Sequence, residues 1–213
     1  MAEMATLSLA SICLDVQIGI CMFLHPSDIL SLRKVCRNQK FLLLKSVESN
    51  LIIIKTCKAL QPSTRQRVVW VAALHRVCFD NVLFLPSFPI TDMSDLEIEK
   101  AAMGPRRWIE LCSAYEKQIL NNPAAILCPR TTRIIDHLFA TKTDLESTDF
   151  FIIPGGRYLV SSSPTNIAVL DLGYTSSADC KLVDSVAPEG GNNDFIVHTT
   201  PDGMGLIIYS SNE

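Results

Sequence analysis

Apolar positions in the first part of the chain recur at helical spacing. Residues 14–24 form an apolar, helix-like segment that stops at His25-Pro26. Polar residues directly after this proline can cap a second helix over residues 29–34. Residues 65–79 predict a third helix, whose apolar positions are interspersed with solvated arginines at 65, 67 and 76.

Two more helices are predicted further along. Ser94 is followed three residues later by Glu97, the signature of a capping box, which predicts a helix through Met103. Gly104-Pro105 breaks that helix. Another helix then runs from residue 106 to about 121, with one apolar face formed by Trp108, Leu111, Cys112, Tyr115 and Ile119.

After Pro129 the pattern changes to that of β-strands. Residues 150–153 and 157–160 flank Pro-Gly-Gly and predict a β-hairpin, and residues 166–172 predict a third strand. A second hairpin, over residues 194–209, repeats the design around Thr-Pro-Asp-Gly. The spacing of the two turns is that of one propeller blade, ~40–45 residues in WD-type repeats. The predicted fold class is therefore α+β, with a helical half followed by antiparallel hairpins.

Composition and charge argue against two classes of protein. Of the 213 residues 48% are hydrophobic and only 19% are charged, with a formal net charge of −3. A chain of this kind has ample apolar side chains for a core but lacks the basic footprint of a nucleic-acid-binding protein. Asp15 and Gln17 interrupt the most hydrophobic N-terminal stretch, so no membrane span is expected.

The eight cysteines do not form a metal-binding or disulfide pattern. They stand at 13, 21, 36, 57, 78, 112, 128 and 180, without a Cys-x-x-Cys pair or a histidine at ligand spacing. We expect reduced thiols packed in the core, no metal and no cofactor. Reduced thiols imply the cytoplasm or the nucleus.

No catalytic arrangement is recognisable. The serines at 161–163 lack a Gly-x-Ser-x-Gly elbow, and His75, His137 and His198 are isolated. Pro154-Gly-Gly joins two predicted strands and lacks the Gly-Lys-Ser/Thr of a phosphate loop. We therefore expect a protein that is not an enzyme.

The segment Ile20-Cys-Met-Phe-Leu-His-Pro26, followed by Ser-Asp-Ile-Leu-Ser-Leu-Arg33, resembles the middle of an F-box. That family continues to a Cys-Lys pair and ends on a tryptophan. Cys57-Lys58 and Trp70 fit this ending, and omitting residues 35–55 restores the register. We interpret residues 35–55 as an insertion or a retained intron; a genuine surface insertion forming an extra helix is the alternative.

The resemblance implies a function. F-box helices bind the C-terminal helices of a Skp-type adaptor, which links them to a cullin–RING (SCF-type) ubiquitin ligase. Pro26 would orient the second helix, and Trp70 would be an anchor of the contact. The residues that the resemblance assigns to adaptor binding are Ile20, Leu24, Pro26, Ile29, Leu30, Leu32 and Trp70.

The remainder of the chain resembles fungal F-box proteins with a WD-like C-terminal region, on Leu85-Pro-Ser-Phe-Pro-Ile, Arg107-Trp-Ile and Cys128-Pro-Arg-Thr-Thr-Arg. This implies an F-box-like domain over 12–79, a helical linker over 80–128 and about two blades of an incomplete β-propeller over 129–213. Because propellers need more blades, we expect a truncated product whose strand half is poorly stable alone. The alternatives are a stand-alone propeller scaffold and an inactive copy; the protein substrate is unknown.

Overall fold

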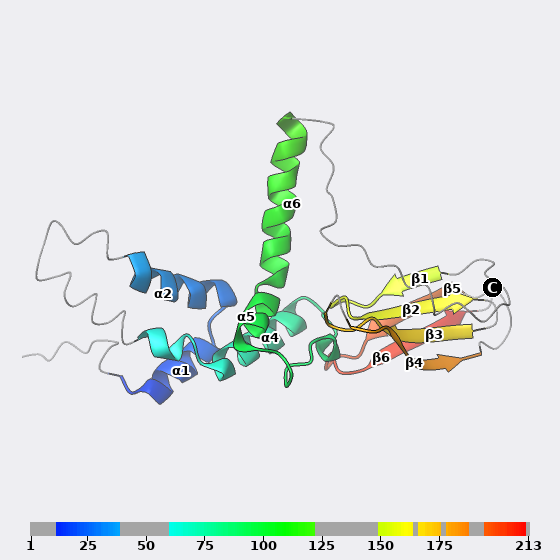
Figure 1. Cartoon of the computed structure of the whole chain (residues 1–213), viewed down its shortest axis with the longest axis horizontal. Coiled ribbons are helices and arrows are strands. Elements are labelled where there is room, and N and C mark those ends of the chain that lie inside the picture. Colours follow the sequence, from blue (N-terminus) through cyan, green and yellow to red (C-terminus); the bar gives the residue numbers. More distant parts are fainter. Residues whose placement is uncertain are drawn as a thin grey trace, which may run out of the picture. The chain divides into compact units, whose positions relative to one another are not determined.

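The computed structural model describes residues 12–38, 60–121, 149–163, 166–175, 178–187 and 194–211. Helices come first and antiparallel strands follow, so the predicted mixed, α+β class is confirmed (Figure 1). The described strands do not close into a barrel. The helices are α1 (Leu14–Met22), α2 (Pro26–Asn38), α4 (Arg67–Asp80), α5 (Asp95–Ala102) and α6 (Gly104–Asn121), with the short 3₁₀ helix η2 (Leu85–Ser87). The strands are β1 (Asp149–Ile152), β2 (Tyr158–Ser163), β3 (Asn166–Asp171), β4 (Lys181–Val186), β5 (Asp194–Thr199) and β6 (Leu206–Ser211).

The chain divides into two compact units. The helical unit comprises Met1–Val77 and Met93–Arg107, and the strand unit comprises Cys78–Asp92 and Trp108–Glu213. The predicted linker over 80–128 is therefore not a separate segment. Its first part belongs to the strand unit, and the stretch that holds α5 belongs to the helical unit.

Local sequence signals account for two helix starts. The side chain of Ser94 accepts a hydrogen bond from the amide of Glu97, whose carboxylate accepts one from the amide of Ser94 at 2.7 Å. The predicted capping box is thus confirmed. Helix α2 begins at Pro26, three residues before its predicted start, so Ser27 and Asp28 lie in its first turn. Proline fits there because the first amides of a helix have no partner within it.

The predicted insertion is only partly described. Residues 35–38 continue α2, and the rest of the segment lies outside the described residues, as does the predicted start of the strand half at Pro129. Among the described cysteines, Cys21 and Cys78 are buried as predicted, but Cys13 and Cys112 are exposed. That correction has a plain reason: α6 carries Cys112 on a helix whose side chains are nearly all exposed.

Four strands form an antiparallel sheet in the order β1-β2-β3-β4, and β5 pairs with β6 in a separate hairpin. Both predicted hairpins and the predicted third strand are therefore confirmed. Strand β4 was not predicted. It pairs with β3 through a register shift between Val169 and Leu170, and all of its side chains are exposed.

The strand unit has one apolar core between its two sheets. Phe84, Ile153, Val160 and Ile167 form the buried cluster. Side chains of the β5–β6 hairpin, namely Phe195, Val197, Leu206 and Ile208, pack against it together with Tyr158 and Val169. The hairpin thus stacks on one face of the four-stranded sheet.

The segment before α5 joins the turns of the two hairpins. The amide of Phe84 donates to the carbonyl of Pro154 at 2.9 Å, and the next amide, of Leu85, donates to the carbonyl of Gly203 at 3.1 Å. Phe84 also meets the ring of Tyr158 edge-on, with centroids 5.6 Å apart. Two consecutive amides therefore hold the two similar turns of the strand unit.

Candidate functional site

Helix α1 has one side packed into the helical unit. Gln17 is 4% exposed, and its Nε2 donates to the carbonyl of Ile12 at 2.9 Å. One turn later Cys21 is 2% exposed and hydrogen-bonded to Ser63; burial raises the pKa of this thiol more than that hydrogen bond lowers it. The buried side of α1 is thus formed by small and polar side chains.

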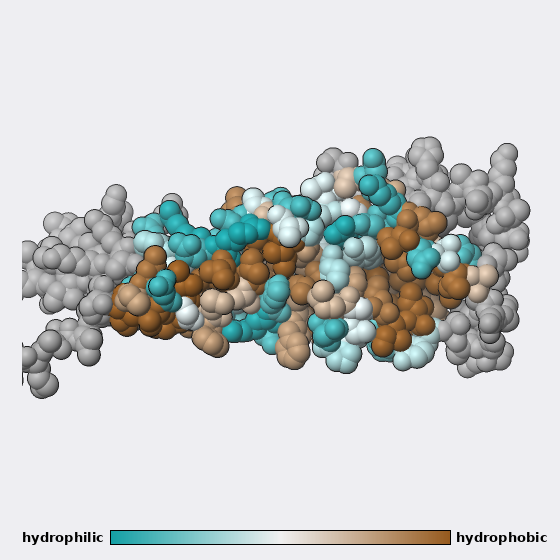
Figure 2. Space-filling view, turned by 90° about the horizontal axis from the view of Figure 1, so that it is seen from below, coloured by the Kyte–Doolittle hydropathy of each residue, from teal (hydrophilic) through white to brown (hydrophobic). Residues whose placement is uncertain are grey.

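The larger apolar side chains of α1 face outward. Val16 and Ile20 on α1 are flanked by the cap residues Cys13 and Phe23. The four follow one another at i, i+3, i+7 and i+10, close to the spacing of a single helix face, and all are exposed. Phe23 is 80% exposed. Figure 2 shows apolar residues gathered on the face of the helical unit that includes α1. We call these four residues the α1 stripe.

An arginine fixes the end of α1. The guanidinium of Arg76, on α4, donates to the carbonyl of Phe23 at 2.6 Å and to that of Met22 at 3.0 Å. The last carbonyls of a helix lack partners within the helix and carry partial negative charge, so a cation is favourable there. This contact fixes the backbone of Phe23, where the stripe ends.

Three of the residues that the resemblance assigned to adaptor binding lie inside the helical unit. Ile29 is fully buried, Trp70 is 1% exposed, and Pro26 is also among the fully buried side chains. In this structure they pack the unit's own interior. They can support a docking surface but do not present one.

The surroundings of Trp70 explain its burial. Its indole Nε1 donates to the carbonyl of Thr64 at 3.0 Å, so the polar atom of the ring is paired. The guanidinium of Arg33 lies over the ring, with its carbon 5.3 Å from the ring centre. Arg33 also donates to Glu99 at 2.8 Å, which ties α2 to α5. Trp70 thus has a complete set of partners within the unit.

The other four assigned residues are at least partly accessible. Ile20 is 42% exposed, and Leu24, Leu30 and Leu32 are half-buried. Only Ile20 belongs to the α1 stripe. Our sequence interpretation missed Val16 and Phe23 as surface residues, although their spacing from Ile20 is the signal that finds them.

The described part of the chain offers no arrangement for metal chemistry. It contains no group of three or more His, Cys, Asp or Glu residues able to hold a metal ion. None of its helices is both long and apolar enough to cross a bilayer. What the helical unit does present is an ordered, uncharged helix face, which is suited to contact with another apolar surface.

Comparison with known proteins adds no family or relative. No protein-family model, curated protein or solved structure matches the chain.

Proposed function

We propose that the chain is an F-box-type adaptor, whose helical unit binds a Skp-type adaptor and through it a cullin–RING ubiquitin ligase. The strand unit, in this proposal, is the beginning of a WD-like propeller that recognises the protein to be ubiquitinated. The order of F-box-like residues between Ile20 and Trp70 motivates the family; the α1 stripe carries the proposed contact.

The α1 stripe supports this proposal by its exposure and its position. Its aliphatic and aromatic side chains stand in water at an energetic cost of roughly 25 cal/mol per Å² of apolar surface, which a covering partner removes. It begins about two turns before the segment that resembles an F-box and runs to Phe23, next to Leu24 and the start of α2. An apolar helix face of the Skp-type adaptor would therefore complete the helical unit.

The test is co-purification of the full chain with a Skp-type adaptor, using a pair of matched variants. Ile20→Asp places a carboxylate in the stripe at a residue that is 42% exposed, and should abolish the association. Leu14→Asp makes the same change on the same helix at a residue that is 44% exposed but outside the stripe. It should leave the association intact.

Equal behaviour of the two variants would contradict the proposal, as would a wild-type chain that does not associate. Circular dichroism and thermal melting of both variants establish that each is folded. Trp70→Ala cannot serve in this test, because loss of a buried tryptophan lowers stability whether or not an adaptor binds.

Removing residues 35–55 tests the interpretation of that segment separately. If it is an insertion or a retained intron, the shortened chain should fold and bind the adaptor at least as well as the full chain. Transcripts that lack the corresponding codons would support the intron. Loss of folding in the shortened chain would instead favour a genuine structural element.

A further inference from the structure

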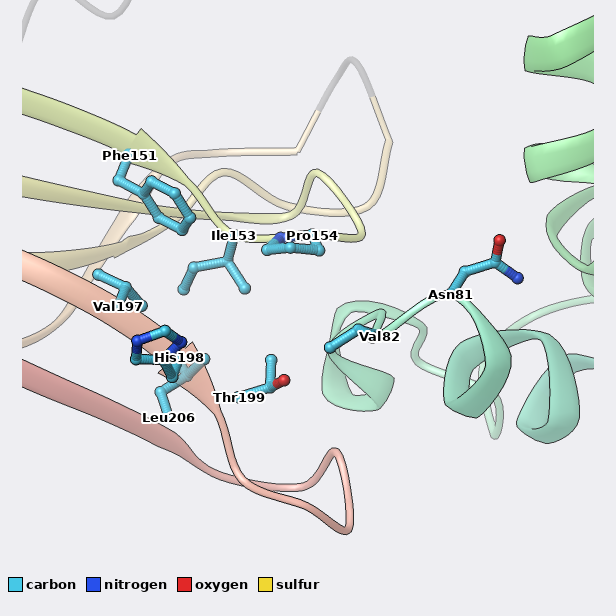
Figure 3. A pocket seen from close by; sticks show the side chains of 9 residues that line it. All are labelled: Asn81, Val82, Phe151, Ile153, Pro154, Val197, His198, Thr199 and Leu206. Atoms are coloured by element: carbon cyan, nitrogen blue, oxygen red, sulfur yellow. The ribbon is translucent and has the colours of Figure 1, made fainter.

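The strand unit has a pocket of about 300 Å³ beside its apolar core. Figure 3 shows that its lining residues come from the end of β1, from the β5–β6 hairpin and from the loop after α4. They do not share the spacing of one helix face or one strand face, so the pocket does not indicate the kind of molecule that would fill it. The α1 stripe of the helical unit differs in this respect, because its spacing is regular.

The spacing of the α1 stripe indicates a helical partner. Its residues are separated by steps of three, four and three, which is the a/d repeat of a coiled-coil seam. From Cys13 to Phe23, at a rise of about 1.5 Å per residue, the stripe is about 15 Å long. A second helix laid along α1 at a small crossing angle would therefore follow the stripe over its whole length. An extended strand, with its period of two, would not match this repeat.

A glycine lies beside the middle of the stripe. Gly19 stands three residues after Val16 and four before Phe23, so both are its neighbours on the helix surface. With Ile20 they occupy the positions i, i+3, i+4 and i+7, which form a hole for a side chain of a facing helix. The three side chains around this hole are 50%, 42% and 80% exposed at Val16, Ile20 and Phe23. We call these four residues the Gly19 hole.

Packing within the helical unit does not account for this glycine. Gly19 is part of α1, so its backbone is helical, and it is not among the glycines with positive φ. Apart from its chain neighbours and the helix backbone, no heavy atom of the described residues lies within 4 Å of a Cβ added there. Glycine weakens a helix interior relative to alanine. Close approach by another molecule would offset that cost.

We infer that Gly19 is a specificity-determining residue of the adaptor contact, and that the Gly19 hole receives one leucine- or phenylalanine-sized side chain from an apolar helix of the Skp-type adaptor. This inference rests on the proposed function and adds the shape of the partner to it. The inserted side chain covers apolar surface of Val16, Ile20 and Phe23. A charged side chain is disfavoured, because the residues of the hole have no polar side-chain atom to pair with it.

The experiment measures the affinity of the full chain for a purified Skp-type adaptor by isothermal titration calorimetry. Gly19→Leu fills the hole and should weaken binding by about tenfold or more, because overpacking a close contact is unfavourable. Gly19→Ala fills the hole only in part and should weaken binding less.

Gly104→Leu is the matched control. Gly104 also belongs to a helix and is half-buried, and nothing among the described residues lies within 4 Å of its added Cβ. It differs in lying outside the α1 stripe, so its replacement should leave the affinity unchanged. Equal weakening by Gly19→Leu and Gly104→Leu would refute the inference.

Thermal melting of the same variants without the adaptor separates binding from a structural role. Gly19→Ala should raise the melting temperature of the chain by roughly 2–4 °C, because alanine favours the helix, although it weakens the complex. A lower melting temperature would show that part of the chain itself fills the hole, and would overturn the inference. A dimer of the chain that is lost in Gly19→Leu, seen by size-exclusion chromatography, would overturn it in favour of a second copy.

The proposed function and this inference fail in different ways. If the wild type binds the adaptor and Ile20→Asp does not, but Gly19→Leu binds as tightly as the wild type, the adaptor contact stands and the inserted side chain is disproved. If the wild-type chain does not bind the adaptor at all, both are overturned.

Discussion

The side chains of Arg33 and Trp70 share one acceptor. The carbonyl of Thr64 accepts a hydrogen bond from the guanidinium of Arg33 at 2.6 Å and one from the indole of Trp70 at 3.0 Å, while the guanidinium lies over the ring. The contact joins α2 to α4 and makes the tryptophan part of the unit's interior. The stability of the helical unit should therefore depend strongly on the indole ring of Trp70.

Trp70→Ala should lower the free energy of unfolding by about 3–5 kcal/mol, the usual cost of removing a buried tryptophan. The chain has one other tryptophan, Trp108, which is 58% exposed on α6. Trp108→Ala should change the free energy of unfolding by less than about 0.5 kcal/mol. Urea unfolding followed by circular dichroism measures both, and similar losses would contradict the assignment of Trp70 to the interior.

The turn between β1 and β2 should tolerate alanine at one glycine and not at the next. Gly155 has a φ of +116°, and an added Cβ there would lie 2.5 Å from the Cβ of Ser87. Gly156 also has positive φ, +78°, but nothing lies within 4 Å of its added Cβ. Gly156→Ala should therefore cost only the about 1–2 kcal/mol of the backbone conformation. Gly155→Ala should cost distinctly more, and thermal melting compares the two.

An ion pair in the strand unit should make the stability of the fold depend on pH in the acid range. Arg157 donates to both carboxylate oxygens of Asp171, at 2.9 and 2.6 Å, which lowers the pKa of that carboxyl below its ordinary 3.8. Because the pKa of Asp171 is lower in the folded state, the ion pair stabilises the fold fully at pH values above 3.8. This stabilisation is lost as the pH falls through the lower pKa of the folded state.

The Asp171→Asn variant isolates that contribution. At neutral pH it should be less stable than the wild type by about 1.5–3 kcal/mol, the range for hydrogen bonds to charged groups. The difference should shrink as the pH falls below 3.8. Asp184→Asn, on the exposed strand β4, is the control and should change little at any pH. A difference that stays constant through the acid range would show that the ion pair is not its source.

Thiol reactivity should follow burial. Burial raises the pKa of the Cys78 thiol to about 12, so very little thiolate forms at neutral pH. Cys13 and Cys112 are exposed. Brief treatment of the folded chain with iodoacetamide, followed by peptide mass spectrometry, should modify these two and spare Cys78. Denaturant should remove the difference, and prior modification of Cys78 in the folded chain would contradict its burial.

Local signals made much of the fold predictable. The capping box of Ser94 and Glu97 and the Pro-Gly-Gly turn after Ile153 each depend on a few neighbouring residues, and both elements formed as predicted. Strand β4 depends instead on pairing with β3. None of its side chains is buried, so its sequence lacks the alternation that marks a half-buried strand.

The candidate site was less predictable, because exposure depends on packing between helices. Both Ile20 and Trp70 are apolar residues of helices, yet one is 42% exposed and the other 1%. Apolar residues surround much of α4, with Val68 exposed and Val69 buried, so its pattern does not indicate which side faces inward. The side of α4 that faces inward is instead determined by its contacts with Arg33 and with the end of α1.

The two consecutive amides at Phe84 and Leu85 bond to the turns of both hairpins, so a fragment meant to form the β-sheet region must include these two residues. A fragment that starts at residue 129 lacks both donors and the aromatic ring at the centre of the apolar cluster. Grafting these strands onto another protein would accordingly require the peptide that follows α4 as well. Supplied in trans, that peptide should act as a complementing piece, much as a missing strand does in a split protein.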